Sequence, residues 1–375
     1  MDHCDTMWNE YLLQCSAIIG GTTLKIGIIG MPQSGKTTTF SLLTNVKLGA
    51  GNKTNIAMGK IPDYRIDALS KLYNPKKTTH AVIEFVDLPG YSNGQGNNGR
   101  DFLGILADVD ALILVIRAFK SDTVPAVNGI QPFGDFNQIQ QELQIADWSL
   151  LETRLERMAK QRNKDSSVEA ELEVLNKCRE ILEQDLPLRQ LDLTQDEERL
   201  IRGYDFLTKK PLIVAVNLDE EQMRTDSYPE KNQLEQDLLE KNIPCIAISG
   251  QLEAEINELD ENDAVLFMEE LGIQEPGIAR VARTVYRHLG LISFFTVGED
   301  EVRAWTVREG NTAPEAAGKI HSDIERGFIR AEVVGYEELM EYGSIQKLKE
   351  KGLFRLEGKD YIVRDGDVMS FRFNV

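Results

Sequence analysis

The sequence predicts an α/β fold: a parallel sheet carrying a phosphate loop, with an inserted pair of antiparallel helices and a small C-terminal unit of strands around one helix. Three motifs predict the sheet. G-x-x-x-x-G-K-T at residues 30–37, D-x-x-G at residues 87–90 and N-x-x-E at residues 217–220 each follow an apolar run. Parallel sheets bind their ligands where the strands end, so the three motifs are expected to meet at one edge.

The first motif predicts a site for a nucleoside triphosphate. The apolar run 24–29 before it reads as a buried strand, and Gly30 and Gly35 let the backbone curl around phosphate at a helix N-terminus. Lys36 is the predicted catalytic cation on the β/γ oxygens, and the Thr37 hydroxyl is a predicted Mg²⁺ ligand. The nucleotide-binding residues predicted in this loop are Gly30, Pro32, Gln33, Ser34, Gly35, Lys36, Thr37 and Thr38.

The second motif supplies metal and γ-phosphate contacts. Residues 80–86 are rich in β-branched and aromatic residues and predict a strand that ends at Asp87. Asp87 is expected to hold Mg²⁺ through a water molecule, and the Gly90 N–H is expected to face the γ-phosphate as a second catalytic group. Hydrolysis would then release the loop that follows.

The third motif bears on which base is bound. The apolar strand 211–216 leads to Asn217, and Glu220 stands where GTPases usually carry the Asp of Asn-Lys-x-Asp. That Asp accepts from two neighbouring donors of guanine, so a carboxylate displaced by one methylene weakens or inverts guanine selectivity. Leu218 lacks the long stem of the usual Lys, and Ser249 fits the last loop on the base side. Alternatively, Asn217 is only a turn residue.

Together with the stretches 62–69 and 356–368, these motifs resemble the YchF (Obg-like ATPase) family of translation-factor-related P-loop NTPases. The resemblance covers roughly residues 24 to 375. It implies a G-domain with a helical insertion, followed by a C-terminal TGS domain of ubiquitin-like shape. It also implies slow hydrolysis of ATP in preference to GTP, and association with ribosomes or RNA.

The periodicity of the chain agrees with that outline. Apolar residues from Leu143 to Met158, then from Val168 to Leu182, recur at spacings of three, four or seven and predict two antiparallel helices with a hairpin near 163–167. Strand character resumes near Lys210, which makes the helices an insertion. The predicted domains are a G-domain at 24–135 and 203–290, a helical domain at 136–202, a TGS domain at 291–375 and a disordered extension at 1–23. The alternative is that the extension is an over-long gene prediction.

The C-terminal region predicts a β-grasp unit. Strands are expected at 293–297, 302–307, 361–363 and 368–373, and a helix at 313–325 with Pro314 in its first turn. Phe328 and Arg330 could contact RNA, although Phe328 is more often a core residue in such a position.

Charge limits the possible partners. The chain has 61 acidic and 42 basic residues and a net charge of −19, so it cannot attract nucleic acid through its overall field. A contact to ribosome or RNA through the TGS and helical domains needs a local basic patch. The patch predicted in the TGS domain comprises Lys347, Lys349, Lys351, Arg355 and Lys359. We expect no membrane segment, four reduced cysteines, a monomer and a cytoplasmic location.

Three departures from the family pattern bear on hydrolysis. Gln33 replaces an Asn that is a potential ligand for a monovalent cation in related GTPases, and Thr54 is the best substitute for the Mg²⁺-binding Thr of the family. Ala126 stands where the family has a His that supports attack by water. We therefore expect a slow ATPase; the alternatives are a nucleotide sensor with weak or no turnover, and a guanine-specific GTPase.

Overall fold

The computed structural model describes residues 24–47, 54–88, 103–121, 124, 129–160, 166–273 and 275–374. The chain divides into two compact units. The nucleotide unit comprises Lys25–Met58 and Glu84–Val281, and the C-terminal unit comprises Gly59–Ile83 and Ala282–Val375. The segment Gly59–Ile83 thus groups with the C-terminal unit, although the sequence boundaries place it in the G-domain; those boundaries stay a prediction.

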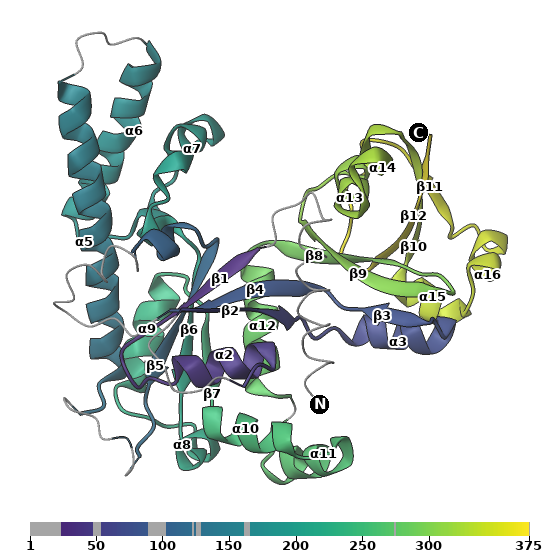
Figure 1. Cartoon of the computed structure of the whole chain (residues 1–375), viewed down its shortest axis with the longest axis horizontal. Helices are drawn as coiled ribbons and strands as arrows, with labels where there is room; N and C mark the ends of the chain where they lie inside the picture. The colour runs from purple at the N-terminus through teal and green to yellow at the C-terminus, as the bar shows by residue number, and fades with distance from the viewer. Residues whose placement is uncertain are drawn as a thin grey trace. The chain divides into compact units, whose positions relative to one another are not determined.

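The nucleotide unit is built on a six-stranded sheet in the order β2-β4-β1-β5-β6-β7 (Figure 1). The strands are β1 (Lys25–Ile29), β2 (Asn55–Lys60), β4 (Val82–Asp87), β5 (Ala111–Arg117), β6 (Leu212–Asn217) and β7 (Cys245–Ile248). The neighbouring pairs β4–β1, β1–β5, β5–β6 and β6–β7 are all parallel. Every residue of β5 and β6 is buried, which is why these strands read as continuous apolar runs. The strands predicted before all three motifs are confirmed.

Helices surround this sheet and a large apolar core. They are α2 (Lys36–Thr44), α5 (Pro132–Ala159), α6 (Ser166–Glu183), α7 (Gln195–Ile201), α8 (Glu220–Thr225), α9 (Lys231–Glu240), α10 (Gly250–Glu258), α11 (Glu261–Glu270) and α12 (Gly277–His288), the last crossing into the C-terminal unit. Side chains of β5 and β6 pack with Phe136 and Leu143 of α5 and with Leu234 and Leu238 of α9. The core therefore fixes the start of α5 against the sheet.

Helices α5 and α6 run side by side as a long antiparallel pair (Figure 1). They share a second apolar cluster with α7, in which Leu151, Met158, Leu175 and Leu182 are buried. This matches the predicted spacing of apolar residues, except that Leu150 is 41% exposed. The first helix begins at Pro132, which occupies the first turn where a proline costs no hydrogen bond.

The C-terminal unit has its own six-stranded sheet in the order β11-β10-β12-β8-β9-β3. The strands are β3 (Lys77–Thr79), β8 (Leu291–Thr296), β9 (Glu301–Arg308), β10 (Phe328–Gly335), β11 (Arg355–Glu357) and β12 (Asp367–Phe373). Its helices are α3 (Tyr64–Tyr73), α13 (Ala313–Ile320), α14 (Ser322–Arg326), α15 (Tyr336–Tyr342) and α16 (Ile345–Glu350). Strand β3 pairs in parallel with β9, so the segment Gly59–Ile83 contributes a strand to this sheet.

Two expectations for this unit need correction. The single helix predicted at 313–325 is two helices, because His321 adopts an extended conformation and its side chain caps α14 by accepting from the Asp323 N–H. The strand predicted at 361–363 is one isolated bridge, between Ile362 and Thr312. Phe328 is buried in the core of the sheet, as the sequence favoured. No helix in the described part of the chain is both long and apolar enough to cross a membrane.

Candidate nucleotide site

The loop between β1 and α2 needs glycine at two positions. Gly30 has φ of 153°, and a Cβ there would lie 2.3 Å from the Val115 carbonyl oxygen. Gly35 has φ of 97°, and a Cβ there would lie 2.2 Å from Asn217 Nδ2. These are the two glycines of the phosphate-loop motif, so the motif reflects both backbone conformation and close packing against β5 and β6.

Lys36 lies at the start of α2 and is only 6% exposed. Its ammonium group donates to the Met31 carbonyl across the loop at 2.8 Å. Burial lowers the pKa of Lys36 to about 8, while the nearby Asp87 carboxylate partly opposes that shift. The N-cap Gly35 offers no side chain to the first N–H groups of α2. A buried cation and uncapped N–H groups are what a phosphate chain requires.

Asp87, at the end of β4, meets Thr37 and Asn55. The Thr37 hydroxyl donates to Asp87 Oδ2 at 3.1 Å, and the Asn55 amide donates to the same oxygen at 3.3 Å. Asp87 is 3% exposed, and burial raises the pKa of its carboxyl. Its second oxygen, Oδ1, is buried and has no hydrogen-bond partner among the described residues. A hydroxyl beside a carboxylate with a spare oxygen is a suitable donor set for Mg²⁺.

Sequence reasoning missed Asn55. It assigned the neighbouring Thr54 as a metal ligand, and Thr54 is half-buried immediately before β2. Asn55 lies at the start of that strand, and only the pairing of β2 beside β4 brings it to Asp87. No three His, Cys, Asp or Glu residues cluster as a metal site within the described ranges.

Asn217 connects the loops that surround the phosphate loop. Its amide donates from Nδ2 to the Ser34 carbonyl at 3.1 Å, and its Oδ1 accepts from the Gly250 N–H at 3.0 Å. The side chain is buried, with only 5% of it exposed. Asn217 is therefore a structural link between three loops rather than a simple turn residue after β6.

The residues after Asn217 divide between the core and the surface. Leu218 is buried in the apolar cluster of the sheet, and Asp219 caps α8 by accepting from the Gln222 N–H at 2.9 Å. Glu220 is exposed in the first turn of that helix and lines a pocket of about 370 Å³ with Met223, Leu252 and Arg280 among others. Asp219 is thus engaged by the backbone, whereas Glu220, like Glu221, is exposed.

The remaining predicted residues have varied environments. Ser249 is buried and caps α10, with its hydroxyl 3.5 Å from the Leu252 N–H, while the Ser34 hydroxyl is buried without a described partner. Pro32, Gln33 and Thr38 are exposed around the loop. Gly90, Ala126 and the loop 91–100 lie outside the described residues. Of the C-terminal basic residues, the four lysines are exposed, whereas Arg355 is paired with Asp367 and Glu357.

The parallel sheet, phosphate loop and Asp87 site define the class of P-loop nucleotide-binding proteins. Comparisons with known proteins agree. The family model described as "50S ribosome-binding GTPase" matches residues 25–177, and the YchF GTPase C-terminal model, described as a protein of unknown function, matches residues 291–374. The chain belongs to the YchF family, as its relatives show.

Two curated relatives illustrate that relationship. The ribosome-binding ATPase YchF of Bacillus subtilis is 40% identical over 366 residues, which cover 94% of this chain and 100% of that relative. The ribosome-binding ATPase YchF of Escherichia coli O157:H7 is 40% identical over 362 residues, covering 94% and 99%. The solved structure of the Schizosaccharomyces pombe YchF GTPase superposes with a TM-score of 0.83 at 30% identity, covering 95% of this chain and 99% of that one.

Proposed function

We propose that this protein binds ATP with Mg²⁺ and hydrolyses it slowly, with GTP as a less preferred substrate, and that its nucleotide state controls association with the ribosome. The observation that carries the proposal is the convergence of Lys36, Thr37 and Asp87 where β1 and β4 end. Relatives that are about 40% identical over nearly the whole chain are named ribosome-binding ATPases, which supports the same activity here.

The chain's own residues would bind and orient the triphosphate. Lys36 would exchange its bond to the Met31 carbonyl for phosphate oxygens, and the phosphate charge would favour its protonated form. Thr37 and Asp87 would hold Mg²⁺, with Thr54 as a further proposed ligand and the Gly90 N–H facing the γ-phosphate. When bound, Mg²⁺ neutralises charge on the β- and γ-phosphate oxygens. Catalysis would then rest on positioning and electrostatics.

The preference for ATP is assigned to Glu220. Its carboxylate is exposed at the start of α8, and the neighbouring Asp219 is engaged as the helix cap. A Glu at this position does not reproduce the bidentate acceptor that an Asp offers to guanine. Glu220→Asp should therefore raise the ratio of GTP to ATP affinity by about tenfold, the discrimination expected for one polar contact. An unchanged ratio would show that Glu220 does not select the base.

The macromolecular contacts follow the predicted domains. We propose that the helical domain at 136–202 and the TGS domain at 291–375 contact the ribosome or RNA, while the G-domain at 24–135 and 203–290 binds nucleotide. The exposed lysines 347, 349, 351 and 359 support a local contact despite the overall acidity of the chain. We also propose that the protein acts as a monomer in the cytoplasm, where ribosomes are found.

A nucleotide sensor without useful turnover is the second candidate. It is favoured by Ala126, which replaces the histidine that the family pattern has in the loop after β5. Binding would survive this replacement, because the proposed binding residues Lys36, Asp87 and Asn217 are unaffected by it. Regulation would then depend on exchange of nucleotide instead of its hydrolysis.

One experiment separates these candidates. The purified protein is titrated with fluorescent ATP and GTP in Mg²⁺, and phosphate release is then measured on the same sample with and without ribosomes. We expect ATP preference and release that ribosomes stimulate, with Lys36→Ala as the inactive control. Tight binding without release in either condition would make the protein a sensor, and absence of nucleotide binding would overturn both candidates.

A further inference from the structure

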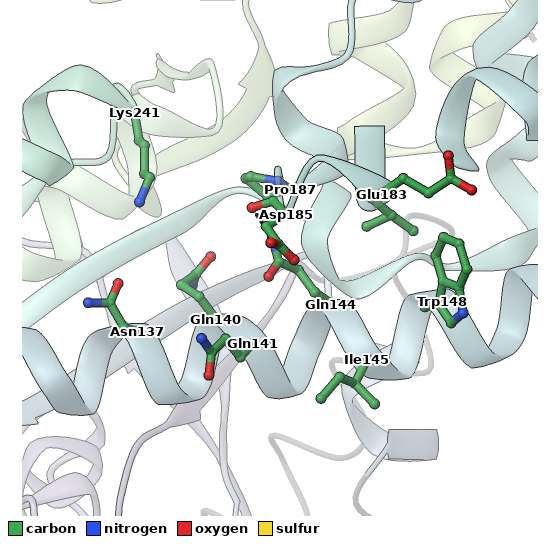
Figure 2. Close-up of a pocket in the computed structure, with 11 residues that line it drawn as sticks. Asn137, Gln140, Gln141, Gln144, Ile145, Trp148, Glu183, Asp185, Pro187 and Lys241 are labelled. Atoms are coloured by element: carbon green, nitrogen blue, oxygen red, sulfur yellow. Dashed lines mark hydrogen bonds between the residues drawn. The ribbon is translucent and has the colours of Figure 1, made fainter. Parts of the chain in front are cut away.

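A groove of about 550 Å³ lies along one face of α5, away from the phosphate loop. Figure 2 shows its lining, with Lys241 across the groove from α5 and Ile145 pointing away from the other α5 side chains. Asn137, Gln140, Gln141, Gln144 and Trp148 come from α5. Leu182 and Glu183 at the end of α6, together with Asp185 and Pro187 beyond it, form the opposite side.

The groove contains an amide with unused hydrogen-bonding capacity. Gln140 is 8% exposed; its Oε1 accepts from Arg189 at 3.1 Å, but its Nε2 is buried without a partner among the described residues. Gln144, one turn further, donates to the Asp185 carbonyl at 2.8 Å. A buried donor without an acceptor costs about 1–3 kcal/mol, which a ligand carbonyl at this position would recover.

The other lining groups indicate the chemistry of the ligand. Side-chain amides both donate and accept, as a peptide backbone does. Trp148, Leu182 and Pro187 supply apolar surface to the lining, with Pro187 beside Asp185 (Figure 2). From Asn137 to Trp148 the helix rises about 16 Å, the length of about five residues of extended chain. The groove is thus long enough to hold a short extended peptide.

Charge at the Asp185 rim favours a cationic group, although Arg189, which donates to Gln140, places one buried cation beside the groove. Lys241 is bound by both carboxylate oxygens of Asp237 at 2.7 Å, which offsets its charge. Glu183 is paired with Arg179 at 3.1 Å, whereas Asp185 is exposed at the rim. Since the whole chain also carries a net charge of −19, RNA would enter this groove against the field.

We propose that this groove binds an extended peptide segment of a partner protein, with a backbone carbonyl at Gln140, an apolar side chain against Trp148 and a Lys or Arg beside Asp185. The site is distinct from the nucleotide site and does not require hydrolysis. It gives the α5–α6 pair a recognition surface whose specificity comes from side-chain amides and apolar side chains.

The test uses fluorescence anisotropy with the full chain and three labelled probes: an eight-residue peptide of alternating Lys and Leu, its Glu–Leu counterpart, and octauridylate RNA. We expect the Lys–Leu peptide to bind best. Glu183→Gln with Asp185→Asn should weaken it about fivefold. The matched control, Glu156→Gln with Glu173→Gln, removes two exposed charges from the same helices outside the groove lining and should leave affinity unchanged.

A second variant tests the amide directly. Gln140→Met should weaken the Lys–Leu peptide about fivefold, while Gln138→Met, on α5 but outside the groove lining, should not. Thermal melts confirm that each variant is folded. The proposal would be overturned if the variants and their controls lost affinity equally, or if the Lys–Leu peptide did not bind. It would also be overturned if the protein preferred octauridylate and the Glu183→Gln with Asp185→Asn variant bound it more tightly; that result would make the groove an RNA site.

Discussion

Asp87 in the nucleotide unit and Asp367 in the C-terminal unit are both buried carboxylates, each 3% exposed, but their partners differ. Asp367 accepts from the Tyr361 hydroxyl at 2.8 Å, the Arg364 N–H at 2.9 Å and Arg355 at 3.3 Å, so both of its oxygens are used. Among the described residues, Asp87 accepts through Oδ2 alone, and its buried Oδ1 has no hydrogen-bond partner. The hydrogen bonds of Asp367 are thus complete within the described fold, whereas Asp87 keeps one oxygen available to a ligand.

The same contrast holds across the two units. Among the described residues, every buried side-chain nitrogen or oxygen without a hydrogen-bond partner belongs to the nucleotide unit. Those atoms belong to Ser34, Asp87, Gln140, Glu152, Arg189 and Arg280, and the Glu152 oxygen still forms an ion pair with Arg179 at 3.3 Å. In the C-terminal unit the buried Tyr286 hydroxyl has three partners within about 3.0 Å. Among the described residues, unpaired buried polar atoms are therefore confined to the unit that carries the candidate nucleotide site.

The largest effect should come from removing the cation of the phosphate loop. Lys36→Ala should lower ATP turnover at least a hundredfold, about 3 kcal/mol in the barrier, because one preorganised charge on the transferring phosphate is lost. Stability of the nucleotide-free protein should not fall, since burial disfavours the Lys36 charge. Phosphate release and thermal melts measure the two quantities. If Lys36→Ala lowered the melting temperature as well as ATP turnover, Lys36 would be part of the framework, which would contradict the contrast between the units.

The lowered pKa of the buried Lys36 should also make the stability of the protein depend on pH. Its pKa is lowered to about 8 in the folded protein from an ordinary value of 10.5. Between these values the unfolded chain binds more protons than the folded one, so the contribution of Lys36 to stability rises as the pH rises from 8 to 10.5 and stays at its lowest value below 8. Urea unfolding of wild type and Lys36→Met should diverge by about 3 kcal/mol over this interval. If the unfolding free energies of the two proteins changed with pH in parallel, burial would not lower the pKa of Lys36.

In the C-terminal unit, the paired network should behave in the opposite way. Arg65 donates to Asp63 and to Asp365, at distances of 2.8 Å to each, so Arg65→Met leaves two carboxylates without their cation. We expect a loss of about 2 kcal/mol in unfolding free energy and unchanged nucleotide affinity. Lys76→Met is the matched control, because its ion pair with Asp300 is more than four-fifths exposed and should contribute little. If Arg65→Met changed nucleotide affinity and Lys76→Met did not, the ion-pair network of the C-terminal unit would not be independent of nucleotide binding.

Local sequence predicted the parts of the site that local structure controls. A strand followed by glycines identified the phosphate loop, and the strand before Asp87 located the carboxylate. Asn55 could not be found in this way, because its role depends on β2 lying beside β4. The break at His321 was missed for a related reason: its ring caps α14, whereas helical periodicity continues through it.

Contacts between distant segments explain the other limits of the sequence prediction. The stretches 62–69 and 356–368 contributed to the family resemblance without an assigned role, and the structure brings them together through Arg65 and Asp365, three hundred positions apart. Likewise, β3 reads as an unremarkable polar segment and becomes a strand only by pairing with β9. Such contacts require the tertiary fold, which no periodicity in the sequence reports.

The smallest expected effect concerns Gln33, where the phosphate loop departs from the family pattern. Gln33 has φ of 63°, in the left-handed region that Asn occupies more readily than Gln. Gln33→Asn should therefore raise the unfolding free energy by about 0.5 kcal/mol, measured in urea without nucleotide. Phosphate release in potassium and in sodium then tests whether the Asn also introduces activation by a monovalent cation. If the Asn variant is more stable but potassium does not activate it, the Asn of the family pattern acts on loop conformation. If potassium activates the variant without a gain in stability, the Asn acts in the nucleotide site. The second result would sharpen the contrast between framework groups and ligand-binding groups.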